Sequence, residues 1–340
     1  MRTLKKILLC LILFSPALQA HLTTLVDPQT RSIEINQFIQ KMVNEHQFNE
    51  SELTQLLGQA ETKDSILQAI SKPAENVLPW FKYKNIFLGQ KRVEEGVQFW
   101  KKNQKTLNKA YKKYGVPPEI IVGIIGVETF YGKQKGNYRV LDALVTLAFD
   151  YPPRSLFFRS ELEAFLLMTR EENLDPTQLL GSYAGAMGMP QFIASSYRRF
   201  AVDFSGKGKR DLINNTEDVI GSVANYFVQS GWKTNEPVIL PVINTGLNKY
   251  LTTLETHAKN PQLKYTLEAL YEQNVQLVNP SANLNPKTRI AVIPLEEEQG
   301  LTYWLGLNNF YVITRYNHSN HYAMAVYELS QKIKSLKEQG

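Results

Sequence analysis

The clearest indication of the fold comes from residues 115–132, which read GVPPEIIVGIIGVETFYG. The two prolines and Glu119 favour the start of a helix, because proline is tolerated in the first turn and an acid stabilises the positive end of the helix dipole. Residues 120–127 are apolar on every side, as expected of a helix that is buried all round. The spacing predicts a buried helix that ends near Gly132.

Glu128 stands at the end of this apolar helix. A carboxylate in such surroundings is costly unless it is paired or protonated. Burial would raise its pKa, which is what a general acid at neutral pH requires. A partly exposed glutamate bonded to Thr129 or to nearby backbone would fit the same residues, and one glutamate alone favours that structural interpretation.

On both sides of this stretch the apolar residues recur at helical spacing. Helices are predicted within 35–71 and over 86–113, 140–150, 156–171, 190–201, 216–230 and 322–337. After Pro237 the composition changes to short β-rich runs, at 238–243, 274–278, 288–294 and 309–315. The chain is therefore expected to be α+β and mainly α, with a small β-containing domain.

Residues 1–20 have the composition of a secretory signal peptide. Arg2, Lys5 and Lys6 precede an apolar run, and small residues end at Ala20. A short N-terminal anchor is the alternative. A lipoprotein is not expected, because Leu9 stands before Cys10 where a small residue is needed. The mature chain would be periplasmic and without cysteine, so without an internal disulfide.

The signal peptide also accounts for part of the basic charge. Its three cations reduce the formal net charge from +6 to +3 when it is removed. No nucleic-acid partner follows from so small a charge. Six lysines do cover one face of the helix predicted over 86–113, and these are Lys101, Lys102, Lys105, Lys109, Lys112 and Lys113. A solvated face is the default interpretation, and weak attraction to an anionic polymer is the sharper one.

A second unusual stretch is YAGAMGMPQF, residues 183–192. Small residues and glycines allow a backbone to approach a ligand closely. Gln191 adds a polar amide and Phe192 adds an aromatic face. A tight turn between helices, with glycines required for packing, would have the same composition.

Several motifs together resemble one known family. GVETFYG at 126–132, YRVLDAL at 138–144, AFDYP at 148–152, YAGAMGMPQF at 183–192 and IGSVANYF at 220–227 occur in this order, followed by LGLNNFYVITRYN at 305–317 and HYAMAV at 321–326. The sequence closely resembles the membrane-bound lytic murein transglycosylase B family, including its soluble 35 kDa type, from about residue 35 to 335.

The resemblance implies a lysozyme-like catalytic domain with flanking helices. On this basis we expect a signal peptide at 1–20, a helical region at 21–115, a catalytic core at 116–235, a β-containing domain at 236–316 and a C-terminal helix at 317–340 that packs back on the α region. It further implies cleavage of the β-1,4 bond between N-acetylmuramic acid and N-acetylglucosamine in peptidoglycan. The product would carry a 1,6-anhydromuramyl end.

By the family motif, Glu128 would be the single acid/base. Further residues fall where the family lines its glycan groove, and these are Ser182, Gln191, Phe192, Tyr316, Asn317, Tyr322 and, with less support, Tyr83. Ordinary glycosidases use two carboxylates, and the motifs contain no clear second one. Asp142 and Asp150 are expected to be structural hydrogen-bonding residues. A muramidase that adds water, or a non-catalytic peptidoglycan-binding protein, are the alternatives.

The family often has an EF-hand-like calcium loop, and here it corresponds to residues 203–217. Asp203, Ser205 and Glu217 match ligand positions, but Lys207 stands where a carboxylate is expected. Calcium requires oxygen ligands, so we expect this loop to be degenerate, with weak calcium binding or none. No cofactor is required for the predicted reaction.

The expected partner is the glycan strand of peptidoglycan, acted on by a monomer. Cell-wall synthesis or division proteins are conceivable further partners, which the residues do not identify.

Overall fold

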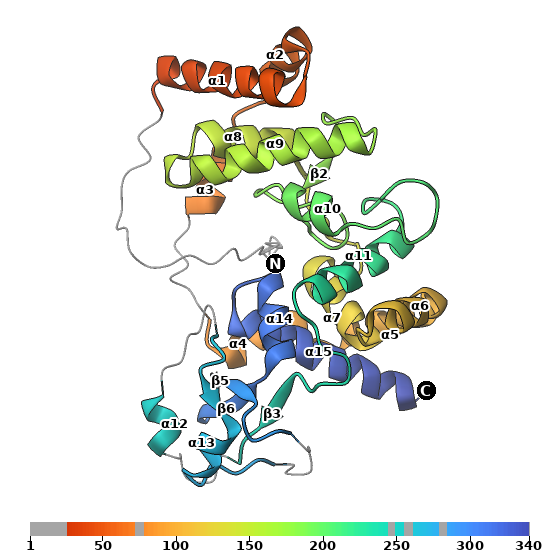
Figure 1. Ribbon diagram of the computed structural model, residues 1–340, viewed down its shortest axis with the longest axis vertical. Helices are drawn as coiled ribbons and strands as arrows, with labels where there is room; N and C mark the ends of the chain where they lie inside the picture. Colours follow the sequence, from red (N-terminus) through yellow and green to blue (C-terminus); the bar gives the residue numbers. More distant parts are fainter. Residues whose placement is uncertain (1–25, 72–77, 244–248, 255–260, 279–283, 340) are drawn as a thin grey trace, which may run out of the picture. The chain divides into compact units, whose positions relative to one another are not determined.

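A computed structural model describes residues 26–71, 78–243, 249–254, 261–278 and 284–339 (Figure 1). The chain divides into two compact units. Among the described residues, the first unit takes 26–71 and 132–222, and the second takes 78–131 and those from 223 onward. Each unit thus joins segments that are far apart in sequence. The signal peptide predicted for residues 1–20 lies outside the described residues.

The regular secondary structure of the first unit is almost entirely helical. Its elements are α1 (Pro28–His46), α2 (Glu50–Gly58), α3 (Asp64–Ser71), β1 (Tyr138–Arg139), α8 (Val140–Phe149), η1 (Pro152–Arg154), α9 (Ser155–Glu171), β2 (Leu180–Gly181), α10 (Ala194–Phe200) and the first half of α11 (Thr216–Gln229). All ten residues of α8 are buried. This helix packs against α9, so the pair forms the centre of the unit.

The second unit contains the apolar helix predicted from residues 115–132. Its elements are α4 (Trp80–Phe87), α5 (Gln90–Lys102), α6 (Gln104–Tyr114), α7 (Pro118–Thr129), β3 (Ile239–Pro241), α12 (Lys249–Thr253), β4 (Tyr265–Thr266), α13 (Leu267–Tyr271), β5 (Arg289–Glu297), β6 (Gly300–Gly306), α14 (Asn308–Tyr316) and α15 (Asn320–Gln339). Helix α7 packs against α5 and α15, which explains why it has no polar face.

Helix α7 approaches α15 closely at Gly123. A Cβ atom at this position would lie 2.9 Å from the Val326 carbonyl oxygen and 3.2 Å from the Ser330 Cβ. The glycine therefore sets the distance between the two helices and, through α7, the position of Glu128.

We expect Gly123→Ala to lower the free energy of unfolding by about 1–3 kcal/mol, because overpacking outweighs the better helix propensity of alanine. Urea denaturation measures the effect. Gly58→Ala is the matched control, since nothing lies within 4 Å of its new Cβ. Equal stability of the two variants would show that α7 and α15 can move apart without cost.

The small sheet of the second unit is antiparallel, in the order β3-β6-β5-β4. Its longest pairing joins β5 to β6, with Val292 opposite Leu305. One face of the sheet is buried in an apolar cluster that includes these two residues, Leu267 and Leu270. The β-containing part is thus held together by a core of its own.

Several predicted elements are confirmed and others need correction. The helix expected over 86–113 is broken, with parts in α4, α5 and α6. The run at 309–315 is helix α14, not a strand, because its buried residues Phe310, Ile313 and Thr314 follow helical spacing. The run at 274–278 contributes only an isolated bridge at Leu277. Strand β6 was not predicted at all.

The C-terminal helix is confirmed as α15. Over the described residues the protein is mainly helical, with one four-stranded and one two-stranded sheet, which agrees with the expected mainly α class. Across the described ranges, none of the helices has the length and apolar character needed to cross a membrane.

Candidate active site

The end of α7, where Glu128 stands, is held rigidly. Phe130 and Tyr131 both adopt left-handed backbone angles, with φ of 50° and 59°, and their N–H groups return to carbonyl oxygens of α7. Arg92 of α5 donates from Nη1 to the Gly126 carbonyl oxygen at 2.9 Å. The Tyr131 hydroxyl donates to the Arg92 carbonyl oxygen at 2.8 Å. A cation at a helix C-terminus is favourable, so α5 fixes the turn that carries Glu128.

Glu128 is only partly exposed and has one strong partner. The Tyr322 hydroxyl of α15 donates to its Oε1 at 2.5 Å. Burial raises the pKa of Glu128 to about 7, against the opposing effect of this hydrogen bond. A carboxyl group with such a pKa can give up a proton and take it back near neutral pH. These are the properties that the catalytic interpretation of Glu128 requires, and the hydrogen bond to its carboxylate comes from Tyr322.

Two further predicted residues lie near this pair in the second unit. Tyr83 of α4 is buried, and its pKa is raised by burial and by the charge of Glu128. Tyr316 at the end of α14 packs against Tyr226, with ring centroids 4.8 Å apart. Burial is also the main reason why the pKa of Tyr322 is high, with contributions from Glu128 and Tyr316.

Asn317 follows Tyr316 directly. Its side-chain Oδ1 is buried and accepts no hydrogen bond within the described part of the chain. Buried acceptors are normally hydrogen-bonded, and either a water molecule or a ligand can supply the donor that this oxygen lacks. The second unit therefore gathers Glu128, Tyr322, Tyr83 and Tyr316, with Asn317 beside them.

The remaining predicted residues belong to the first unit, where they shape one compact loop. Ser182 Oγ accepts from the backbone N–H of Ala184 and of Ala186, at 3.3 and 3.0 Å. Phe192 and Met187 exchange two backbone hydrogen bonds. The turn interpretation of residues 183–192 is therefore correct as far as the backbone is concerned.

Gln191 is the unusual residue of this loop. It has a left-handed φ of 53° although it is not glycine. Its Nε2 donates to the Gly188 carbonyl oxygen at 2.9 Å and to the Lys135 carbonyl oxygen at 3.1 Å. Non-glycine residues in this conformation cluster at functional sites. Both amide N–H groups are thus committed to backbone.

Asp142 and Asp150 are structural, as expected from their motifs. Asp142 Oδ1 accepts from Arg139 Nε at 2.9 Å and from the Glu61 N–H at 3.0 Å. Asp150 Oδ1 accepts from Arg31 Nε at 2.8 Å. Both carboxylates thus have hydrogen-bond partners within the first unit.

The degenerate calcium loop is closed by its own hydrogen bonds. Asp203 accepts from the backbone N–H groups of Gly206, Lys207 and Gly208, at 2.7, 2.9 and 2.7 Å. Burial would raise the pKa of Asp203, but these bonds outweigh it and hold the pKa below its usual range.

Asp218, a residue that the motif search did not single out, anchors the loop from α11. It is fully buried and accepts from the N–H groups of Phe204, Ser205 and Asp211, at 2.9, 2.8 and 3.0 Å. The backbone N–H of Glu217 donates to Asn215 Oδ1. The buried carboxylate of Asp218 thus holds the backbone of this loop in place through three hydrogen bonds.

The residues around this loop do not fit a calcium ion. A hollow of about 260 Å³ is lined by Lys207, Lys209, Asp211, Asn214, Asn215 and Asp218. Two of these side chains are cations, and the carboxylate of Asp218 is taken up by backbone donors. Calcium requires six to eight oxygen ligands, so the ammonium groups oppose it.

We expect calcium at about 1 mM to raise the melting temperature of the protein by less than about 1 °C. Lys207→Asp should restore a measurable calcium-dependent rise, because it replaces the ammonium by a ligand. Differential scanning calorimetry with and without chelator measures both. Tight binding by the parent in a calorimetric titration would contradict this prediction.

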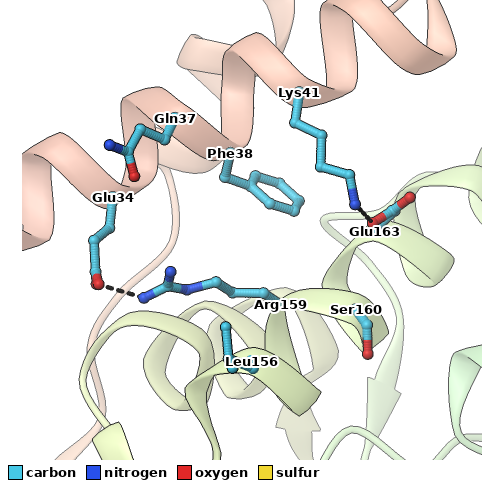
Figure 2. Close-up of a pocket in the computed structure, with 8 residues that line it drawn as sticks. All are labelled: Glu34, Gln37, Phe38, Lys41, Leu156, Arg159, Ser160 and Glu163. Atoms are coloured by element: carbon cyan, nitrogen blue, oxygen red, sulfur yellow. Dashed lines mark hydrogen bonds and ion pairs between the residues drawn. The ribbon is translucent and has the colours of Figure 1, made fainter.

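Figure 2 shows a separate groove in the first unit, between α1 and α9. Its volume is about 280 Å³, and none of the predicted site residues lines it. Glu34 pairs with Arg159 at 2.5 Å and Lys41 pairs with Glu163 at 2.6 Å, with Phe38 between the two pairs. We assign the groove a structural role, because its charges already hold α1 on α9.

The described residues contain one cluster with metal-ligand chemistry, formed by Glu45, His46 and Glu163. His46 Nε2 lies 2.7 Å from one oxygen of Glu163, and the Lys41 ammonium lies 2.6 Å from the other. Lys41 already supplies the positive charge that a metal would bring. The cluster therefore gives no reason to assign a metal.

Sequence reasoning missed three residues around the Glu128 cluster. Arg92 caps the helix, and Trp80 and His321 flank the ring of Tyr83, with ring centroids 6.2 and 5.4 Å from it. Burial lowers the pKa of His321. The available signal for His321 was its position directly before Tyr322, which was a predicted groove residue. No local pattern pointed to Arg92.

Comparison with known proteins gives a consistent result. The family model of the transglycosylase SLT domain matches residues 31–331. Membrane-bound lytic murein transglycosylase B of Escherichia coli K12 is 44% identical over 306 residues, which cover 87% of this chain and 81% of that protein.

Solved structures agree with this result. The soluble lytic transglycosylase SltB1 of Pseudomonas aeruginosa superimposes with a TM-score of 0.84 at 44% identity, covering 90% of this chain and 99% of that one. The lytic transglycosylase Slt35 of Escherichia coli, solved in complex with calcium, gives 0.82 at 43% identity, covering 90% and 94%.

Proposed function

The chain belongs to the transglycosylase SLT domain family, whose model spans residues 31–331, and we propose that it is a peptidoglycan lytic transglycosylase. It cleaves the β-1,4 bond between N-acetylmuramic acid and N-acetylglucosamine and leaves a 1,6-anhydromuramyl end. The observation that carries the proposal is the Glu128 carboxyl group, with a pKa of about 7 and a hydrogen bond from Tyr322.

The first step uses Glu128 as an acid. Its proton passes to the glycosidic oxygen while the bond from that oxygen to the anomeric carbon breaks, so N-acetylglucosamine leaves with a free 4-hydroxyl group. The carbonyl oxygen of the muramyl N-acetyl group stabilises the anomeric carbon. A pKa near 7 keeps a large fraction of Glu128 protonated at neutral pH, as this step requires.

The second step uses the same residue as a base. Glu128, now ionised, takes the proton of the muramyl 6-hydroxyl while O6 forms a bond to the anomeric carbon. The hydroxyl belongs to the same sugar, which gives it a large effective concentration over water. Each proton that leaves Glu128 returns to it, so one carboxylate suffices and no cofactor is required.

The other predicted residues bind the glycan. Tyr83, Tyr316 and Tyr322 offer aromatic faces for sugar rings. The buried, unpaired Oδ1 of Asn317 is suited to accept a hydrogen bond from a sugar amide or hydroxyl group. Ser182, Gln191 and Phe192, on the loop of the first unit, are assigned to glycan binding by the family motif.

Mass spectrometry of products from purified sacculi tests the proposal. Anhydro ends, lighter than reducing ends by one water, are expected from the parent protein and not from Glu128→Gln. Reducing ends would instead identify a muramidase that admits water to the anomeric carbon. Absence of products from the parent would favour a peptidoglycan-binding protein without turnover.

The place of action is part of the same proposal. The signal peptide predicted at residues 1–20 would direct the protein to the periplasm, where its substrate lies. We expect it to act as a monomer, and contact with cell-wall synthesis or division proteins would be additional to its contact with peptidoglycan.

A further inference from the structure

His321, in the first turn of α15, lies beside the Glu128 cluster, and the proposed mechanism gives it no role. It directly precedes Tyr322, whose hydroxyl group donates to Glu128. Helix α15 packs against α4, and this contact brings the imidazole to two aromatic side chains of α4. The ring centroid of His321 lies 5.7 Å from that of Trp80 and 5.4 Å from that of Tyr83. The imidazole is therefore next to a side chain already assigned to glycan binding.

The two aromatic neighbours hold the His321 ring in place. Trp80 is fully buried and Tyr83 is 5% exposed, so packing fixes both of them. Their planes are tilted from the imidazole plane by 49° and 45°, at a separation that is usual for interacting aromatic rings. His321 itself remains partly exposed. The imidazole is thus an oriented group with part of its surface open.

The polar atoms of His321 and Tyr83 are open to a partner from outside the chain. Within the described residues, neither imidazole nitrogen has a hydrogen-bond partner, and the same is true of the Tyr83 hydroxyl group. Trp80 Nε1 is buried without an acceptor, but these three atoms are not shut off from solvent in the same way. They therefore lie at the surface, where a ligand can replace the water that bonds to them.

The charge of the imidazole limits the kind of ligand that fits. Burial lowers the pKa of His321 from its ordinary value of 6.5, so the ring is mostly neutral at neutral pH. A neutral imidazole has one donor nitrogen and one acceptor nitrogen, and it has no charge with which to attract a carboxylate. A sugar hydroxyl group both donates and accepts, and an N-acetyl amide does so through separate atoms. Either group matches the imidazole.

The residue type also indicates contact with a ligand. A phenyl ring would pack on Trp80 and Tyr83 as well as an imidazole does, without taking two nitrogens partly out of water. The imidazole adds polar atoms to the aromatic surface, next to the Tyr83 hydroxyl group. Aromatic side chains with a few fixed polar groups are typical of ligand sites. A glycan, which presents neighbouring hydroxyl groups on each ring, suits this pair.

We propose that His321 is a further glycan-binding residue, whose imidazole forms a hydrogen bond with a hydroxyl or N-acetyl group of the glycan strand beside Tyr83. This inference rests on the proposed function for the identity of the ligand. It gives His321 a contact with bound glycan and no proton transfer. Loss of the contact should therefore weaken binding and leave the chemical step unchanged.

NMR of the imidazole nitrogens tests the contact on the unaltered ring. Protein with nitrogen-15-labelled histidine, in the Glu128→Gln background so that nothing is cleaved, is titrated with a soluble tetrasaccharide. The tetrasaccharide alternates N-acetylglucosamine with N-acetylmuramic acid and carries no stem peptides. We expect a nitrogen signal of His321, assigned by its absence from His321→Phe, to move as the site fills, while those of the exposed His318 stay in place. An unmoved His321 signal at saturation would overturn the inference.

Calorimetric titration with the same tetrasaccharide measures the effect on affinity. His321→Phe keeps a ring against Trp80 and Tyr83 but has no nitrogen, and we expect about fivefold weaker binding, as the loss of one neutral hydrogen bond predicts. His318→Phe is the matched control, because it makes the same substitution at an exposed position just before α15. Circular dichroism checks that both variants are folded. Equal affinity of the two variants would overturn the inference, since packing of the ring would then be its whole contribution.

Turnover of the tetrasaccharide with Glu128 restored separates this inference from the proposed function. His321→Phe should raise KM about fivefold and leave kcat unchanged, because a contact made equally in the bound substrate and in the transition state affects binding alone. A fall in kcat with unchanged KM would place His321 in the chemical step and overturn the inference. A parent that binds the tetrasaccharide without forming product would contradict the proposed function, whereas the affinity comparison would still decide the role of His321.

Discussion

Replacing Glu128 by glutamine is expected to reduce the rate of anhydro-product formation by about 10²–10⁴-fold. The amide has nearly the same shape and can still accept the hydrogen bond from Tyr322, but it neither gives up nor takes a proton in either step. Binding of glycan should remain within about twofold of the parent, because a neutral amide resembles the protonated acid that meets the substrate. Kinetics on sacculi and cosedimentation measure the two quantities.

The same substitution should stabilise the protein at alkaline pH. Burial raises the pKa of Glu128 to about 7 from an ordinary value of 4.5. Between these two values the unfolded chain releases the proton while the folded chain keeps it, so stability falls as the pH rises through this window and stays low above it. Glutamine removes the penalty, and we expect a gain of about 1–3 kcal/mol above pH 8 and none below pH 4.

This stability measurement also serves as the control for the kinetic one. An inactive variant that is more stable at pH 8 has lost its proton donor and not its fold. An active variant would show that another group supplies the proton. An inactive variant that is destabilised at every pH would indicate that Glu128 is a structural residue.

Replacing Tyr322 by phenylalanine is the second large effect that we expect. The hydroxyl group donates to Glu128 Oε1 at 2.5 Å and favours the ionised carboxylate. Without it the pKa of Glu128 should rise further, so the alkaline limb of the pH–rate profile moves upward by about one pH unit, as the loss of a hydrogen bond to a charged group predicts. The maximum rate should fall about 10–100-fold, because Glu128 loses its orientation.

Tyr327→Phe is the matched control, since it removes a hydroxyl group from the same helix. Burial raises the pKa of Tyr327, and the charges that also shift it are those of Glu328 and Lys334, not that of Glu128. Its pH–rate profile should match that of the parent. If Tyr322→Phe lowered the rate while leaving the alkaline limb unmoved, the hydroxyl group would act on the substrate and not on the pKa of Glu128.

The helical part of the fold was largely predictable from local sequence. Helix α7 was recognisable because its apolar residues on all sides and its first-turn prolines are local properties. The β-containing part was harder. The residues of α14 have strand-like composition, but Phe310, Ile313 and Thr314 must face one core. Packing then selects the helical spacing, which composition alone does not reveal.

In the candidate site, too, some features follow from local sequence and others follow only from packing. The position of Glu128 on an apolar helix indicates a raised pKa, and the family motifs indicate which residues are expected to line the glycan groove. The loop anchored by Asp218 shows the limit of motif matching. The carboxylate that organises this loop lies one residue beyond the position that the calcium pattern indicated, because it must reach three backbone N–H groups at once.

The order of residues along the chain therefore establishes the helices, the family resemblance and a carboxylate that is costly to ionise, since each depends on neighbours within a few turns. It does not establish that carboxylate's hydrogen-bond partner. Tyr322 lies 194 positions after Glu128 and meets it because α7 packs against α15, with Gly123 allowing the close approach. The pKa of Glu128 results from burial by distant segments, and burial is a property of the folded chain that no local stretch of sequence possesses.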